Sequence, residues 1–145
     1  FIILHVIPTI IYKYLLPQDA SSNPNNKLKQ TAVLLSVAIA GFGIILFPHI
    51  IPNFFPKFIE AVEAIQIMSI AIIPAMFSLL YTSKLLGLEK SKFVLISKII
   101  ATSSLIIGFI ILGPIFGIIG LASVFVSVSI FEASFLFSIN KIKKL

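Results

Sequence analysis

Long runs of apolar residues, separated by short polar segments, make up most of this chain of 145 residues. A helix that crosses a bilayer needs about 20 mostly apolar residues. Four runs reach that length, and an apolar N-terminal stretch adds part of a fifth helix. The predicted spans are residues 32–51, 62–86, 93–112 and 117–139, with a partial span at residues 1–16. The pattern predicts an all-α fold, a polytopic transmembrane helical bundle in which residues 1–145 form one domain.

The segments between these runs have the composition of loops at a membrane surface. The first, PQDASSNPNNKLKQ, is rich in Pro, Ser and Asn and predicts a solvated connection. The second, PNFFPKFIEA, mixes aromatic rings with charges, as is typical of a membrane interface. The third, GLEKSK, is short and charged. In the fourth, GPIFG, we expect Gly113 and Pro114 to end one helix and Gly117 to let the chain reverse.

Composition agrees with this pattern. Hydrophobic residues make up 59% of the chain and charged residues 11%, and the mean hydropathy is +1.15. Soluble domains contain roughly 45–50% apolar and about 25% charged residues. We therefore expect the lipid bilayer to be the main partner of the chain.

The lysines fall mostly on one side of the predicted bundle. When the connections alternate across a bilayer, Lys57 lies on one side and all the other lysines lie at or near the opposite side: Lys13, Lys27, Lys29, Lys84, Lys90, Lys92, Lys98, Lys141, Lys143 and Lys144. Such a bias marks the cytoplasmic side. It predicts a multi-pass protein of the cytoplasmic (plasma) membrane with a cytoplasmic C-terminus. A nucleic-acid partner is not expected, because the lysines do not lie on one soluble face.

Residues that could carry enzyme chemistry are sparse. The chain has no cysteine, which excludes disulfides, thiolate zinc sites and thiol catalysis. His5 and His49 are isolated, and no catalytic triad, phosphate loop or paired carboxylate is present. We therefore predict no enzyme activity, no cofactor and no metal site. The chain begins FIILHVIP, without Met, and we expect it to be a piece of a longer polypeptide.

Two opposite charges fall inside predicted spans. Glu132 lies about 12 Å into the last helix from its cytoplasmic end, and Lys98 lies about 7–8 Å into its helix from the same side. A charge at such depth is costly and is usually functional. We predict that the two side chains pair. The pair would either have a structural role or take part in substrate or proton handling. Alternatively, the two side chains do not pair: Lys98 extends to the lipid headgroups, and Glu132 contacts Lys141 or water.

A proline and a row of small residues are further candidates. Pro74 lies near the middle of its span and predicts a kink, either static or a hinge, with Ser69 and Ser78 satisfying freed carbonyls. Small residues recur along one face of the last helix and predict close packing of another helix, with substrate lining as the alternative. They are Gly120, Ser123, Ser127, Ser134 and Ser138.

Residues 63–124 resemble the C-terminal part of a polysaccharide or oligosaccharide flippase. Such flippases, also called polysaccharide biosynthesis proteins, belong to the multidrug/oligosaccharidyl-lipid/polysaccharide exporter superfamily. Three segments carry the resemblance: IQIMSIAIIPAMFSLLYTSKLLG with its central proline, GLEKSK, and GPIFGIIGLASV. The resemblance is weaker elsewhere, since Phe54 and Phe55 stand where the family has a glycine. It implies the second lobe of a two-lobed transporter, whose N-terminal helical lobe would be the main protein partner.

The resemblance also implies a function. The chain would be the C-terminal lobe of a flippase that moves a polyprenyl-linked oligosaccharide across the cytoplasmic membrane by alternating access. Lys98 is the deepest lysine, and without any Arg a bidentate phosphate clamp would have to come from the other lobe. The alternatives are a multidrug or small-molecule exporter on the same fold and, in another class, a membrane scaffold or glycan polymerase subunit. A polymerase would need longer outer connections than these.

Overall fold

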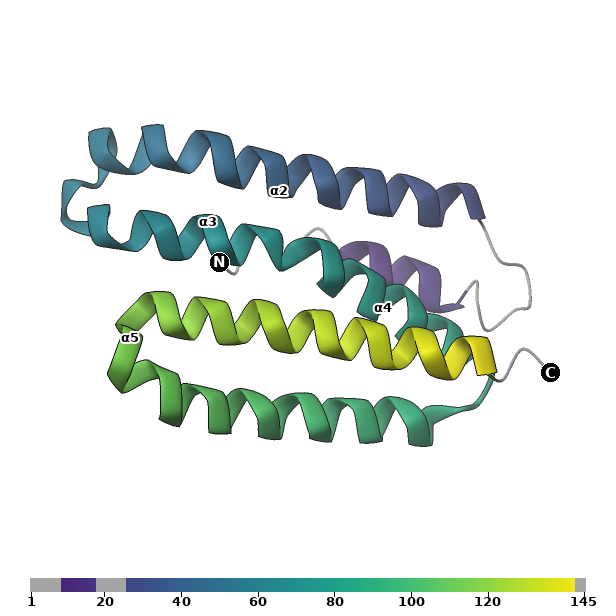
Figure 1. Ribbon diagram of the computed structural model, residues 1–145. Helices are drawn as coiled ribbons and strands as arrows, with labels where there is room; N and C mark the ends of the chain where they lie inside the picture. The colour runs from purple at the N-terminus through teal and green to yellow at the C-terminus, as the bar shows by residue number, and fades with distance from the viewer. Residues whose placement is uncertain (1–8, 18–25, 143–145) are drawn as a thin grey trace.

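The computed structural model describes residues 9–17 and 26–142, and the ordered elements in these ranges are all helices (Figure 1). No strand occurs in this part of the chain, which confirms the all-α class. Residues 9–17 form a short helix that overlaps the predicted partial span and ends one residue beyond it; the first eight residues of that span lie outside the described ranges. The elements that follow are α2 (Asn26–Phe54), the 3-10 helix η1 (Pro56–Ala61), α3 (Val62–Ile70), α4 (Ile72–Gly87) and α5 (Ser91–Ile142).

Three helical stretches are long and apolar enough to cross a membrane: Asn26–Phe54, Pro56–Gly87 and Ser91–Lys141. The last has 51 residues, about 77 Å if it were straight, whereas a bilayer core is about 30 Å thick. It is not straight, because α5 doubles back at Gly117 (Figure 1). We call residues 91–116 the first arm of α5 and residues 118–142 its second arm.

The reversal lies where the sequence predicted it, but the helix ends later than expected. Gly113 and Pro114 remain helical, so the prediction that they end a helix is wrong. The chain turns at Gly117, whose φ of 58° and ψ of −139° are rarely accessible to residues with a side chain. Gly113 instead allows close packing, since a Cβ there would lie 3.2 Å from the Leu121 side chain. A Cβ at Gly120 would lie 2.6 Å from the Leu112 carbonyl oxygen, so the arms meet closely.

Small residues also bring α2 against α3 and α4. The buried positions of α2 recur about once per turn and carry little volume; they include Ala32, Ser36, Ala40 and Gly43. At Gly43 the approach leaves no room for a side chain, because a Cβ there would overlap the side chain of Ser69. Small residues allow such close contact between helices in lipid. The sequence analysis did not single out this row, although its spacing is visible in the sequence.

A side chain repairs the hydrogen-bond gap that Pro48 leaves in α2. Pro48 has no N–H, so the carbonyl of Ile44, four residues earlier, lacks its helical donor. Gln66 of α3 donates its amide Nε2 to that carbonyl at 3.1 Å. Backbone groups exposed to lipid need such partners. This bond holds α3 beside α2.

The predicted kink at Pro74 is present. The helical run breaks at Ala71, between α3 and α4, because Pro74 cannot donate to the carbonyl of Ile70. Ser69 donates to Ile65 O and Ser78 to a glutamate, so the prediction that these serines satisfy freed carbonyls is wrong. Both hydroxyls have better-placed acceptors elsewhere.

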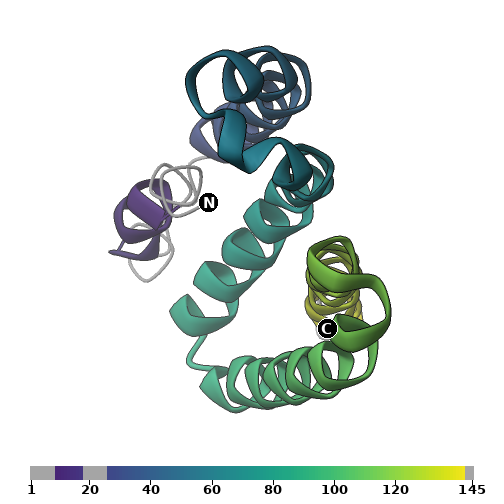
Figure 2. The same cartoon turned by 90° about the vertical axis from the view of Figure 1, so that its left-hand side faces the viewer.

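The helices form two pairs joined by α4. Figure 2 shows α2 and α3 at one end of the cross-section and the arms of α5 at the other, with α4 crossing between them. α4 contacts both α2 and α5. Large apolar side chains point outward; Leu34 is 74%, Phe42 65% and Ile110 69% exposed. Such an exterior suits lipid rather than water.

Most of the described lysines lie on elements that begin or end at one end of the bundle. The start of α2, the end of α4 and both ends of α5 meet there, whereas η1 and Gly117 lie at the opposite end (Figure 1). The first end carries Lys27, Lys29, Lys84, Lys90, Lys92 and Lys141, and η1 carries Lys57. We call the first end the lysine end.

Candidate functional site

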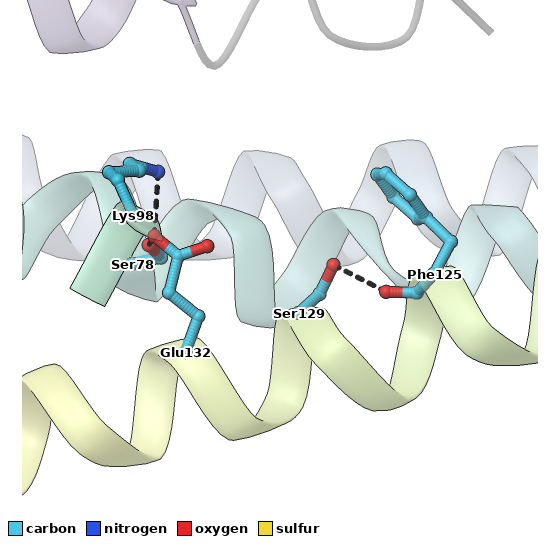
Figure 3. Close-up of polar contacts among 5 residues, drawn as sticks. All are labelled: Ser78, Lys98, Phe125, Ser129 and Glu132. Atoms are coloured by element: carbon cyan, nitrogen blue, oxygen red, sulfur yellow. Dashed lines mark hydrogen bonds and ion pairs between the residues drawn. The ribbon is translucent and has the colours of Figure 1, made fainter. Parts of the chain in front are cut away.

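Three polar side chains from three helical segments meet inside the bundle (Figure 3). Lys98 Nζ of the first arm lies 2.6 Å from Glu132 Oε1 of the second arm, and Ser78 Oγ of α4 donates to the same oxygen at 2.9 Å. The Glu132 side chain is only 12% exposed, whereas that of Lys98 is 50% exposed. Ser78 is buried. We call these three residues the polar cluster.

The reversal at Gly117 explains why the two charges meet. It makes the arms antiparallel, so residues at similar distances before and after the turn lie opposite each other. A Cβ at Gly108 would meet Val124, and Lys98 meets Glu132 further along the same seam. The ion pair predicted from the positions of Lys98 and Glu132 is therefore confirmed. Its function stays a prediction.

α4 supplies the third member because it packs along the hairpin of α5. A tight turn precedes the first arm: Lys90 N–H donates to Leu85 O at 2.8 Å and Glu89 N–H to Leu86 O at 3.0 Å. This pair of bonds is a Schellman motif, which ends a helix and redirects the chain. Sequence reasoning missed the bond from Ser78 to Glu132. The sequence did contain a signal for this bond, because the Ser78 hydroxyl lies in one predicted span and the Glu132 carboxylate, which needs hydrogen-bond donors, lies in another.

Electrostatics favour a paired carboxylate at this position. An isolated charge away from water is costly, and here the Lys98 ammonium and the Ser78 hydroxyl both contact the Glu132 carboxylate. Half of the Lys98 side chain remains exposed, so its ammonium is the more accessible partner. The cluster can therefore hold a partly buried negative charge beside a cation whose side chain is half exposed.

Two further buried hydroxyls lie next to the cluster in sequence. Thr82 follows Ser78 by one helical turn, and Ser97 precedes Lys98. Thr82 Oγ1 and Ser97 Oγ have no hydrogen-bond partner within the described residues. Buried hydroxyls are normally paired, so these two are available to a water molecule or a ligand group. Neither residue was predicted as part of a site.

The predicted small-residue face of the second arm divides in two. Gly120 is buried against the first arm. Its four serines are exposed, and each donates to the carbonyl four residues earlier: Ser123, Ser127, Ser134 and Ser138. The buried residues of this arm instead include Ala122, Ser129 and Ala133. Packing of another helix, or of substrate, on the four serines stays a prediction.

Two cavities lie along α4. The larger, of about 640 Å³, opens near the lysine end between α2, α4 and the end of α5, and its lining includes Lys29 and Lys84. The other, of about 340 Å³, lies between α4 and the second arm and is lined by Pro74, Ser134 and Ser138 among others. Phe77 and Tyr81 line both cavities. Neither cavity was predicted from the sequence.

The residues that the structure describes contain no group of three or more His, Asp or Glu side chains placed to hold a metal ion. Comparison of the chain with protein-family models, with curated proteins and with solved structures finds no match. The resemblance to flippases therefore remains an expectation that depends on the three sequence segments alone.

Proposed function

We propose that the chain is a multi-pass membrane protein with four full spans and part of a fifth. The two arms of α5 would cross separately, since each has about 25 residues and a length of roughly 37 Å. The spans would then be α2, the run from η1 to α4, and the two arms, after a partial span that includes residues 9–16. The lysine end would be cytoplasmic, together with the C-terminus.

We further propose membrane transport as the function, with the chain acting as the C-terminal lobe of a lipid-linked oligosaccharide flippase. The polar cluster is the observation that supports transport best, because a carboxylate and an ammonium sit between apolar helices. Ionisable residues in such places typically mark substrate or proton pathways. The resemblance over residues 63–124 supplies the substrate class.

In this proposal the polar cluster changes partners during the transport cycle. An anionic phosphate on the substrate would compete with Glu132 for the Lys98 ammonium, which is half exposed. Protonation of Glu132 would also release Lys98, because it would remove the negative charge that holds the ammonium. The break before Pro74 would let α4 tilt relative to α3 and alter the contact of Ser78 with the cluster. The N-terminal lobe that the resemblance implies would complete the pathway.

The experiment compares lipid-linked glycans in cells with and without the full-length gene. A membrane-impermeant probe would report which leaflet holds them. We expect loss of the gene to leave complete glycan lipid on the inner leaflet, and re-expression to return it to the outer leaflet. An unchanged pool would contradict the flippase and favour an exporter of drugs or small molecules, which the half-buried carboxylate of Glu132 also fits. A drop in glycan length without inner-leaflet accumulation would favour the polymerase subunit.

Variants of the polar cluster test its part in transport. We expect Glu132→Gln and Lys98→Gln each to lower the transport rate by at least tenfold at normal protein abundance. The control is Thr31→Ala, because Thr31 is exposed and its hydroxyl bonds only to its own helix in the structure. Recovery of full transport in the charge-swapped pair, Lys98→Glu with Glu132→Lys, would leave the pair with a structural role only.

A further inference from the structure

Two buried hydroxyl groups lie between the polar cluster and the lysine end. Thr82 of α4 is 5% exposed and Ser97 of the first arm is 3% exposed. Neither Thr82 Oγ1 nor Ser97 Oγ has a hydrogen-bond partner in the part of the chain that the structure describes. Buried hydroxyls are normally paired with protein or with ordered water. Both hydroxyls therefore remain able to bond a ligand that enters the bundle.

The two hydroxyls lie at similar depths. Thr82 is five residues before Gly87, where α4 ends, and Ser97 is six residues after Ser91, where α5 begins. At about 1.5 Å per residue, both positions are roughly 7–9 Å from the lysine end. Ser78 is four residues farther into α4, about 6 Å deeper. Along α4, a path from the lysine end to the polar cluster therefore passes Thr82 before it reaches Ser78.

Thr82 lies on the face of α4 that meets the second arm. Ser78, Thr82 and Leu85 are all buried, and their spacing of four and three residues puts them on one side of the helix. Ser78 donates to Glu132 of the second arm from this side. One turn beyond Glu132 toward the lysine end, Leu136 is fully buried. Thr82 therefore shares the face that carries the bond to Glu132, one turn closer to the lysine end.

Ser97 lies on the face of the first arm that meets the second arm. Ser97 and Ala101 are buried one turn apart, and Gly108 follows on the same side of the helix. A Cβ at Gly108 would meet Val124 of the second arm. α4 packs against the same hairpin (Figure 2). Ser97 and Thr82 therefore both face the interior between α4 and the two arms, where the polar cluster lies.

Water fits this site better than an ion does. The Lys98 ammonium disfavours a second cation, and the Glu132 carboxylate disfavours an anion. Both contacts of Glu132 fall on Oε1, so Oε2 has no partner within the described residues. A hydroxyl can donate and accept, as water can. One water molecule can bond both hydroxyls and donate to Oε2, which are the roughly three bonds typical of buried water.

We propose that Thr82 and Ser97 hold internal water that links the Glu132 carboxylate to the lysine end. This hydration requires no transport activity. A second step rests on the proposed transport function: the water passes protons to Glu132 from the lysine end. It gives one proton to Oε2 and takes another from solvent at that end, so it stays neutral while the carboxylate is neutralised. The Lys98 ammonium then loses the negative charge that holds it.

X-ray radiolysis of the full-length protein, followed by mass spectrometry, tests the hydration directly. Hydroxyl radicals formed from bound water oxidise the side chains beside it, even where bulk water does not reach. Leu85 and Leu136 lie next to the proposed site and are 1% and 0% exposed. Ile72 is equally buried but lies on the other side of Pro74. We expect both leucines to be oxidised about threefold faster than Ile72, after correction for intrinsic reactivity.

Thermal unfolding of variants tests whether the two hydroxyls share the water. Thr82→Val and Ser97→Ala each remove a hydroxyl with little change of shape. We expect each to lower the unfolding temperature by about 2–4 °C. The double variant should lower it by less than the sum, because either single variant already releases the water. Oxidation of Leu85 and Leu136 should fall about threefold in each variant.

Ser129→Ala is the matched control. Ser129 is buried in the same bundle, and its hydroxyl donates to Phe125 O of its own helix at 2.8 Å (Figure 3). This variant removes a hydroxyl that needs no water, so the oxidation of the two leucines should not change. If Thr82→Val does not fold, the oxidation measured in Ser97→Ala decides.

Three results would overturn the proposal. The first is oxidation of Leu85 and Leu136 no faster than that of Ile72. The second is a rise in unfolding temperature in Thr82→Val, because removal of an unpaired buried hydroxyl is stabilising. The third is strictly additive losses, which would mean that each hydroxyl bonds its own helix. Failure of the flippase experiment with oxidation of the leucines intact would reject transport and the proton step, and leave the hydration site standing.

Discussion

At the residue scale, Gly43 is a position where α2 lies too close to α3 for a side chain to fit. A Cβ at this position would overlap the side chain of Ser69, whose hydroxyl is already bonded to Ile65 O. We expect Gly43→Ala to lower the free energy of unfolding by about 1–3 kcal/mol, because α2 and α3 must move apart. Thermal unfolding in detergent, followed by circular dichroism, would measure the loss.

Gly41 provides the matched control on the same helix. A Cβ at Gly41 would have no heavy atom within 4 Å. Gly41→Ala should therefore leave stability unchanged or raise it by up to about 1 kcal/mol, the helix-propensity gain of Ala over Gly. Equal losses at both positions would show that close packing at Gly43 is not the cause. Ser69→Gly should restore part of the stability lost in Gly43→Ala.

The candidate site was only partly predictable at this scale. Depth along antiparallel helices was enough to predict the pairing of Lys98 with Glu132. It could not predict Ser78, because that contact depends on the rotation of α4 about its axis. The same rotation buries Thr82. Rotation follows from packing against neighbouring helices, which sequence periodicity describes poorly when nearly every face is apolar.

At the element scale, the bond between Gln66 and Ile44 O couples α3 to the proline of α2. Gln66→Leu should lower the free energy of unfolding by about 1 kcal/mol, because it leaves the Ile44 carbonyl without a donor. In Pro48→Ala the new N–H would bond that carbonyl within α2. We therefore expect Gln66→Leu to cost less than half as much in the Pro48→Ala background. Identical costs in both backgrounds, in a double-mutant cycle of thermal unfolding, would refute the coupling.

The turn between α4 and α5 holds a residue in a strained conformation. Glu89 has a φ of 58°, at the left-handed position of the Schellman motif where glycine is usual. Glu89→Gly should raise the free energy of unfolding by about 0.5–1 kcal/mol by removing that strain. Leu88→Gly serves as the control: Leu88 has a φ of −91°, so glycine there only adds backbone freedom and should lower stability. A fall in the unfolding temperature of both variants would contradict this account.

The helices themselves were largely predictable, and their ends and contacts were not. Runs of apolar residues gave the helical segments, and Gly117 gave the reversal. The end of the first arm was misplaced because Gly113 and Pro114 resemble a helix stop in sequence, whereas close packing against Leu121 explains the glycine. The small-residue row of α2 was overlooked for a similar reason. In an apolar sequence, small residues allow close packing only where another helix lies opposite them, and the tertiary fold decides which helix that is.

At the scale of the whole molecule, the described parts combine one charged end with apolar sides. Lysines gather where α2 begins, where α4 ends and at both ends of α5, while the outward-facing side chains between the ends are mostly apolar. Lysines near a bilayer surface prefer the cytoplasmic side. If both arms of α5 cross the membrane, Ser91 and Lys141 must lie on one side and Phe116 on the other. The prediction of four spans and the prediction of a cytoplasmic lysine end therefore depend on each other, because both require the two arms of α5 to cross separately.

Single cysteines can test this arrangement without background, because the chain has none. Ser91, Phe116 and Lys141 are exposed, so Ser91→Cys, Phe116→Cys and Lys141→Cys should disturb the fold little. In intact cells we expect an impermeant maleimide to label only the cysteine at position 116, and permeabilised cells to show labelling of all three. If only the cysteines at positions 91 and 141 were labelled, the lysine end would lie outside the cell, and the two arms of α5 would still cross the membrane as a hairpin. Labelling of just one of those two would mean that α5 does not cross twice, and the four-span arrangement would fail because the charged end could not lie on a single side.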